Sequence, residues 1–291
     1  MSLNSPATQE PFLNLSHVNM HTVSVSDSVS LRIYSGTKPH NLKIADLQKG
    51  LILVINGTEA VGEGTGFGLP VLAYSDETYF SGTSRLHVSP RGHRCIICKE
   101  FTMDRVARNS FRNVTLENRA ARTFIEHFAH VYQKHPQLRF LTMKGLTEKM
   151  SIGKAFPKAA PMGNVTVTYT VDNTRITVKA DFKSLEKKGL QRIFMLNEQG
   201  SQFFRKYTDS TGTELMDSEI GAWDGTSGEW ACLKTLTGEI GFRLWNARGG
   251  VLRRGREFLE GSLDWVGLDY EISRKVDVFE YVIDVLAGEW R

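Results

Sequence analysis

Cysteine is scarce in this sequence, and so are long apolar runs. The 291 residues contain three cysteines, Cys95, Cys98 and Cys232, too few for the disulfide framework of a small secreted protein. No apolar stretch approaches the roughly 18 residues of a membrane span. The first residues lack the basic start and apolar centre of a secretion signal. We therefore expect a cytoplasmic protein that has no membrane partner.

An excess of charge of one sign is also missing. The chain has 36 basic and 32 acidic residues, and its formal net charge is +4. A balance this close does not indicate a nucleic-acid partner. Basic residues gather only locally, at Arg248, Arg253, Arg254 and Arg256. Two interpretations of this group stay open: it grips an anionic substrate, or it forms the solvated face of a strand and turn.

A nucleotide-binding loop is absent, although glycine alternates with other residues in VGEGTGFGLPV (61 to 71). A dinucleotide fingerprint starting at Gly64 requires glycine at position 69, which is Leu69, and a helix after it. Pro70 and Val71 instead continue into a strand. An alternating-glycine strand has no side chains on one face. The run from Gly62 to Gly68 is thus expected to admit either a ligand or another strand.

The remaining sequence is dominated by the alternation of apolar and polar residues that is typical of half-buried strands. Asn56-Gly57 and Asp172-Asn173 are hairpin signals between such runs. Strands are predicted at 20 to 34, 51 to 55, 69 to 74, 77 to 88, 94 to 104, 165 to 171, 176 to 182, 192 to 197, 201 to 208, 229 to 236, 239 to 246, 263 to 272 and 278 to 286. This pattern predicts a mainly β fold, a large antiparallel β-sandwich of the supersandwich kind.

One segment breaks the β pattern. Leu116, Ala120, Phe124, Phe128 and Tyr132 recur every four residues, which indicates an amphipathic helix. We expect a helical insert at 115 to 150, followed by a Pro- and Gly-rich linker at 151 to 163. The whole chain, 1 to 291, is expected to form a single β-sandwich domain that carries this insert.

Metal and redox motifs are incomplete. Cys95 and Cys98 form a CxxC pair, but a structural zinc site needs a second pair of ligands, and these cysteines fall in a predicted strand, where they face opposite sides of the sheet. Glu126, His127 and His130 read EHFAH rather than the HExxH of zinc proteases. We expect no metal and no cofactor. A third interpretation is a metal-dependent hydrolase that uses His87, His93 and acidic residues. Metal bound to the purified protein would support it.

Aromatic and polar residues are concentrated in the last third of the chain. All five tryptophans lie there, at positions 223, 230, 245, 265 and 290, among arginines and carboxylates. Sugar sites combine flat aromatic faces with planar polar groups that read hydroxyls. Large β-sandwiches also use tryptophan as core filling. The cluster favours either a sugar site or a tryptophan-rich core or interface.

Two segments resemble a known family. NVTVTYTVDNTRITVKADF (164 to 182) and the following RIFMLNEQGSQFF are similar to the paired strands and the strand-end motif of the galactose mutarotase-like β-sandwich superfamily, which includes aldose 1-epimerases and related carbohydrate-active domains. The resemblance implies a β-sandwich and a sugar ligand. The catalytic histidine of the epimerases would fall near Glu198 and Gln199, and no histidine follows His135. Epimerase chemistry therefore requires another acid or base, such as His87.

The sequence predicts a carbohydrate-active or carbohydrate-binding protein with acid/base chemistry of the epimerase, lyase or hydrolase type. Its ligand is expected to be a sugar or an acidic sugar. The alternative is a non-catalytic binding or scaffold protein that self-associates through its tryptophan-rich face. The candidate catalytic residues are Glu198, Glu257, Asp224 and His87, and the candidate substrate-binding residues are Arg205, Tyr207, Trp223, Arg243 and Arg256.

Overall fold

A computed structural model of the chain describes residues 19–35, 49–62, 64–74, 78–91, 94–105, 162–221, 223–259 and 263–288. The described part is nearly all β, and it contains no α-helix. Among its residues, no helix has the length and apolar character that a bilayer crossing requires. The expected helical insert at 115 to 150, and with it His127 and His130, lies outside the described residues.

Eighteen strands and one short 3-10 helix make up the described fold, and every strand pairing is antiparallel. They are β1 (Asn19–Ser24), β2 (Val29–Ser35), β3 (Ile52–Ile55), β4 (Thr58–Glu59), β5 (Gly66–Tyr74), β6 (Thr78–Arg91), β7 (Arg94–Arg105), β8 (Asn164–Asp172), β9 (Arg175–Asp181), β10 (Leu190–Gly200), β11 (Lys206–Asp209), β12 (Glu214–Met216), η2 (Asp217–Ile220), β13 (Asp224–Gly225), β14 (Trp230–Lys234), β15 (Ile240–Trp245), β16 (Gly250–Leu259), β17 (Leu263–Ser273) and β18 (Val278–Ala287).

Fourteen of these strands form one sheet, in the order β12-β11-β14-β15-β18-β9-β8-β7-β6-β5-β10-β17-β16-β13. The sheet folds back on itself around a hydrophobic core. The rings of Tyr270 in β17 and Tyr281 in β18 lie 4.7 Å apart, although six strands separate β17 from β18 in the sheet order. Phe67 in β5 and Phe242 in β15 likewise meet at 5.0 Å. Two layers of one sheet thus share one core, as expected for a β-sandwich.

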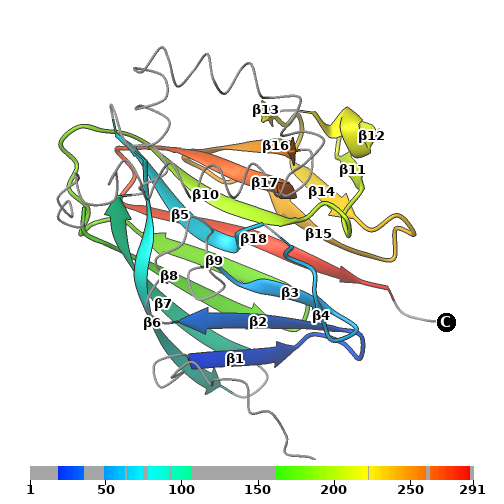
Figure 1. Ribbon diagram of the computed structural model, residues 1–291, viewed down its shortest axis with the longest axis horizontal. Helices are drawn as coiled ribbons and strands as arrows, with labels where there is room; N and C mark the ends of the chain where they lie inside the picture. Colours follow the sequence, from blue (N-terminus) through cyan, green and yellow to red (C-terminus); the bar gives the residue numbers. More distant parts are fainter. Residues whose placement is uncertain are drawn as a thin grey trace, which may run out of the picture.

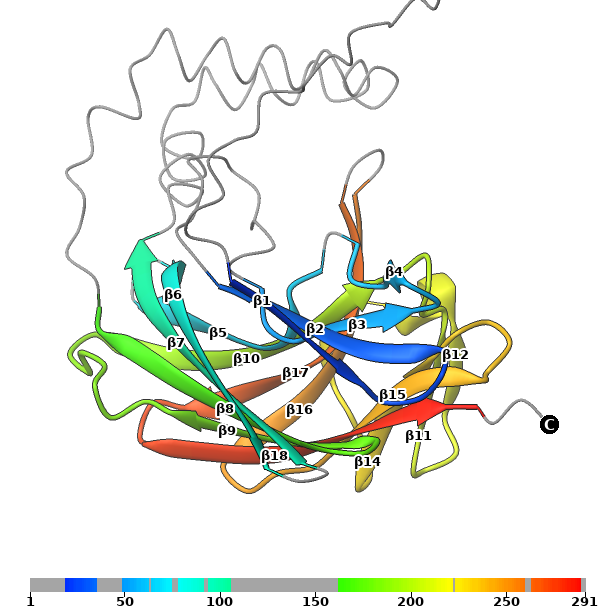
Figure 2. The same cartoon turned by 90° about the horizontal axis from the view of Figure 1, so that it is seen from below.

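A second sheet of four strands, β1-β2-β3-β4, closes the core on another side. Figure 2 shows the large sheet curved like a bowl, with β1, β2 and β3 on its concave side. Leu31 and Ile33 of β2 are fully buried in the same cluster as the large sheet. Lys99 of β7 is also fully buried, and its Nζ donates to the carbonyl oxygens of Tyr34 and Lys49 at 2.5 Å. Burial lowers the pKa of Lys99 well below its ordinary value.

The hairpin signals of the sequence are confirmed. Asn173 joins β8 to β9 with a φ of 53°, and Asn56 and Gly57 join β3 to β4 with φ of 49° and 80°. Positive φ at these positions matches the twist of the flanking strands, which is why Asn and Gly are favoured there. Figure 1 shows β8 and β9 side by side, as their register requires. The strand at 250 to 259, β16, was not predicted.

The glycine run packs against protein rather than ligand in the described part of the chain. A Cβ added at Gly64 would lie 2.7 Å from the carbonyl oxygen of Glu198, and one at Gly66 would lie 3.0 Å from the carbonyl oxygen of Leu51. At Gly68 the obstacle is the Tyr169 hydroxyl, at 2.8 Å. These glycines therefore allow the close approach of neighbouring strands and of one buried phenol.

Candidate functional site

The described site begins with a buried amide in β10. The Asn197 side chain accepts from the Gly68 backbone N–H at 3.0 Å and from the Tyr281 hydroxyl at 2.7 Å. Its Nδ2 donates to the carbonyl oxygens of Met195 and Leu268, each at 3.1 Å. This one fully buried side chain ties β10 to β5, to β17 and, across the core, to β18. The backbone at the next residue is therefore held firmly.

That next residue is Glu198, one of the residues singled out in the sequence. Side chains alternate between the faces of a strand, so Glu198 lies on the face opposite to Asn197. Glu198 pairs with Gly66 of β5 on one side and with Gly267 of β17 on the other. Only 7% of Glu198 is exposed. It is a buried carboxylate flanked on both neighbouring strands by residues that have no side chain.

Trp223 lies over the next glycine pair. Gly267 of β17 pairs with Gly255 of β16. A Cβ at Gly255 would lie 2.3, 2.6 and 2.8 Å from three ring atoms of Trp223, and a Cβ at Gly267 would lie 3.0 Å from the indole Cη2. The indole therefore rests with one face on the backbone of both glycines. The Gly267 position is also 2.9 Å from Cγ of Glu198, so the ring edge and this carboxylate are neighbours.

A second buried carboxylate lies on the same face of β17. Asp269 is two residues from Gly267, and 5% of it is exposed. Its Oδ1 accepts from the backbone N–H of Asn197 at 2.7 Å. Farther along the same face, Glu271 pairs with Arg192 at 3.0 Å and with Arg253 at 2.9 Å. The outer face of β10, β17 and β16 therefore carries acids, arginines and one indole in a continuous row.

The loop that carries Trp223 is fixed by an ion cluster. Asp217 in η2 accepts two hydrogen bonds from Arg205, at 2.8 and 2.7 Å, and one from Arg256 at 2.8 Å. The hydrogen bonds from Arg205, and then those from Arg256, hold the pKa of Asp217 well below its ordinary value. The Arg256 backbone N–H also donates to the carbonyl oxygen of Gly221 at 2.8 Å. Arg205 and Arg256 thus lie together, but on a carboxylate of the protein.

Tyr207 is fully buried and does not form a surface platform. Its hydroxyl donates to Asp209 at 2.9 Å, and the Arg254 guanidinium lies 5.3 Å from the centre of its ring. Burial, and then the bond to Asp209, raises the pKa of Tyr207. The tyrosine therefore helps to hold β16 against β11.

Arg243 belongs to a different surface, on β14, β15 and β18. Its guanidinium stacks over the ring of Trp230, with the Cζ atom 4.5 Å from the ring centre, and lies 5.8 Å from that of Trp245. Trp245 donates from Nε1 to Asp284 at 2.6 Å. Two of the five tryptophans thus serve this cation-π cluster, which is separate from the face that carries Glu198.

The other three candidate residues from the sequence lie on three different strands, β13, β16 and β6. Asp224 is exposed in β13, next to Trp223, and its backbone lies opposite that of Arg254 in the neighbouring strand β16. Glu257 lies in β16, opposite Trp265 of β17. His87 is exposed on β6, where its Nε2 is 3.0 Å from the Ser89 hydroxyl. Among the described residues, β6 pairs with β5 at Leu72–Tyr79 and Ala73–Thr78, near the start of β6, so this pairing does not bring His87 to Glu198.

Several residues of this face were not predicted as site residues. Asp269 and Gly267 carry a signal in the sequence, since GLDYE (267 to 271) places glycine and two acids at alternate positions, whereas Gly255 carries none. That signal has a meaning only once the register sets Gly267 beside Glu198. Asp217 carried no such signal.

Metal ligands do not gather in the described part of the chain. No group of three or more His, Cys, Asp or Glu residues there is arranged to hold a metal ion. Cys95 is buried while Cys98 is partly exposed, as expected for residues on opposite faces of β7. His93, named in the metal-dependent alternative, lies outside the described residues.

Comparison with known proteins gives structural matches at low identity. No protein-family model matches the sequence, and no curated protein matches it. The α-N-acetylgalactosaminidase NagBb from Bifidobacterium bifidum matches in its Gal-NHAc-DNJ complex with 10% identity and in its GalNAc complex with 8% identity, each with a TM-score of 0.48. Both alignments cover 92% of this chain and 36% of that one, so this chain spans about a third of the enzyme's length.

A further match is the Slr1438 protein from Synechocystis sp. PCC 6803. The TM-score is 0.41 at 10% identity, and the alignment covers 99% of this chain and 100% of that chain.

Proposed function

We propose that the outer face of β10, β17 and β16 binds a sugar. The observation that carries the proposal is the Trp223 indole, which rests on Gly255 and Gly267 with its edge beside Glu198. An aromatic ring that lies flat on backbone turns its other face away from the sheet, and Trp223 is only partly buried. Sugar C–H faces stack on such rings, while a neighbouring carboxylate binds hydroxyls.

The same arrangement supports acid/base chemistry on the bound sugar. Glu198 is the first candidate for a proton-transferring group, because it is buried and its backbone is held by the Asn197 network. Such chemistry needs a second group. Glu257 and Asp224 remain the candidates for this second group. Asp269 has a different role: it positions β10 by accepting a hydrogen bond from the Asn197 N–H. This assignment agrees with a galactose mutarotase-like supersandwich in which a carboxylate stands near the position of the epimerase histidine.

The alternative function is a non-catalytic binding or scaffold protein. One observation favours it: Asp217 and Glu271 are each paired with two arginines, as expected where arginines stabilise a surface rather than grip a substrate. Because carboxylates of the protein hold these arginines, a neutral sugar fits the face better than an acidic sugar, which would need arginines to bind its charge.

A thermal-shift screen against neutral sugars, uronic acids and sugar phosphates tests the proposal, since a ligand that binds the native state raises the melting temperature. We expect one sugar class to raise it for the wild type and for Trp230→Ala, which removes a partly buried tryptophan from the other layer, but not for Trp223→Ala. Loss of turnover in Glu198→Gln with binding kept would indicate an enzyme. If no sugar class shifts the cooperative melting of the wild type, the scaffold interpretation stands instead.

A further inference from the structure

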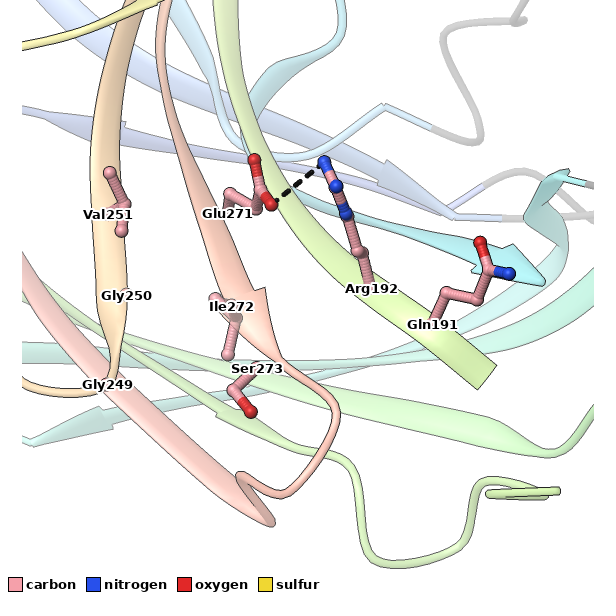
Figure 3. Close-up of a pocket in the computed structure, with 8 residues that line it drawn as sticks. All are labelled: Gln191, Arg192, Gly249, Gly250, Val251, Glu271, Ile272 and Ser273. Carbon is pink, nitrogen blue, oxygen red and sulfur yellow. Dashed lines mark ion pairs between the residues drawn. The ribbon is translucent and has the colours of Figure 1, made fainter. Parts of the chain in front are cut away.

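A pocket of about 510 Å³ lies at the far end of the same three strands. Figure 3 shows its lining: Gln191 and Arg192 from the start of β10, Gly250 and Val251 from the start of β16, and Glu271 and Ser273 from the end of β17. None of these residues belongs to the group around Trp223 and Glu198. The pocket is therefore a second feature of this face, beyond the Trp223 and Glu198 group on which the proposed function rests.

The sheet register places this pocket on the face that carries Glu198. Every second residue of a strand points to the same side, so Gly267, Asp269, Glu271 and Ser273 share one face of β17. In the strand register, Arg192 of β10 lies opposite Ser273, and Val251 of β16 lies opposite Glu271. Ser273 lies six positions after Gly267 in β17, a distance of roughly 20 Å at the rise of a strand. The face between them carries Asp269, Arg253 and Glu271.

The chemistry of the pocket suits a polyhydroxy ligand. Glu271 forms ion pairs with Arg192 at 3.0 Å and with Arg253 at 2.9 Å, so each of these three charges has a partner, and the group as a whole carries one positive charge. The carboxylate and guanidinium groups are planar and retain hydrogen-bonding capacity for hydroxyls, and the side chain of Arg192 is 57% exposed.

The pocket also has an apolar floor. Val251 is 58% exposed. A Cβ at Gly250 would lie 2.7 Å from the Phe279 ring, so the ring supports the bare backbone from below. Exposed apolar surface next to a planar polar group is the combination that the Trp223 site also offers.

We infer that the ligand of this protein is an oligosaccharide that extends along β17 from the Trp223 site to the Arg192–Glu271 pocket. The inference rests on the sugar-binding function proposed above and adds the ligand's length and direction. A monosaccharide fills one end of the face, whereas several linked rings reach both.

Calorimetric titration with saccharides of one to six units tests the inference. The probes are the β-1,4-linked glucose and N-acetylglucosamine series, the α-1,4-linked glucose series and the galacturonate series. For the series that binds, we expect affinity to rise about tenfold or more from the single sugar to the tetramer and then to level off, because added contacts lower the dissociation constant only while the protein offers surface. Arg192→Ala and Glu271→Gln should remove this gain and leave monosaccharide binding unchanged.

Arg175→Ala is the matched control, because Arg175 is similarly exposed, at 61%, and pairs with Asp284 on another surface. It should leave both affinities unchanged. Equal affinity for the single sugar and the tetramer, or a gain that survives in Arg192→Ala and Glu271→Gln, overturns the oligosaccharide inference while sugar binding stands. Absence of binding at every length overturns both proposals.

Discussion

Replacing Gly255 with alanine tests whether Trp223 rests on the backbone of β16. The new methyl carbon would lie 2.3 Å from the indole Cδ2, and ordinary contact begins at 3.4 Å, so the ring has to retreat by about 1.1 Å. Overpacking of this kind costs about 1–3 kcal/mol. The displaced ring also loses its contact with the Gly267 backbone and its place beside Glu198. We expect lower stability together with weaker sugar binding.

Denaturant unfolding of four proteins measures this effect: the wild type, Gly255→Ala, Trp223→Ala and the double variant. If the indole is the obstacle, Gly255→Ala costs little once Trp223 is absent, and the coupling energy between the two sites is about 1–3 kcal/mol. Equal costs in the two backgrounds would refute the stacking argument. Gly225→Ala is the matched control, because Gly225 lies in neighbouring β13 with no atom within 4 Å of an added Cβ and no positive φ. It should be neutral or slightly stabilising.

Two further predictions concern groups that hold the site. Asn197→Ala leaves the Gly68 N–H and the Tyr281 hydroxyl without their acceptor, and we expect a loss of about 3 kcal/mol in the free energy of unfolding. In Gln199→Leu the same measurement should change by less than about 1 kcal/mol, because neither amide atom of the buried Gln199 has a partner. The pKa of Asp217 is lowered in the folded state from an ordinary value of 3.8, so its stabilising contribution is complete above that value and is lost as the pH falls through the folded pKa. The free energy of unfolding, measured at each pH, should therefore be higher for the wild type than for Asp217→Asn by an amount that is constant above about pH 5 and shrinks below about pH 4. Salt should reduce this difference, because the carboxylate is partly exposed. An advantage that persists unchanged at pH 3 would contradict this assignment.

The strands that follow local rules could be predicted from the sequence. β8 and β9 alternate cleanly and are joined at Asn173, whose positive φ belongs to the turn. β16 was missed because Arg253, Arg254 and Arg256 interrupt the alternation of apolar and polar residues by which the other strands were predicted. The structure gives each arginine a partner on another element: Glu271 in β17, the Tyr207 ring in β11 and Asp217 in η2. These partners are distant in the sequence, so the local pattern of residues cannot reveal them.

The site shows the same limit. Glu198 and Trp223 were both candidates, but their proximity depends on the pairing of β10 with β17 and of β17 with β16. Gly255 and Gly267 acquire their role only from that register, which sets them opposite each other beneath the Trp223 ring. Arg243 and Arg256, which the sequence grouped together, point to different surfaces because they belong to opposite layers of the folded sheet.

The two halves of the site are held by different means, and this division has a consequence for binding. Glu198 follows Asn197, whose hydrogen bonds reach three other strands, so the backbone that carries the carboxylate cannot move without disturbing the core. Trp223 follows η2, which is held to β16 by partly exposed charges at Asp217 and Arg256. Surface ion pairs stabilise far less than buried hydrogen-bond networks. Adjustment to ligands of different shape therefore falls to the indole, while the backbone that carries the acid stays in place.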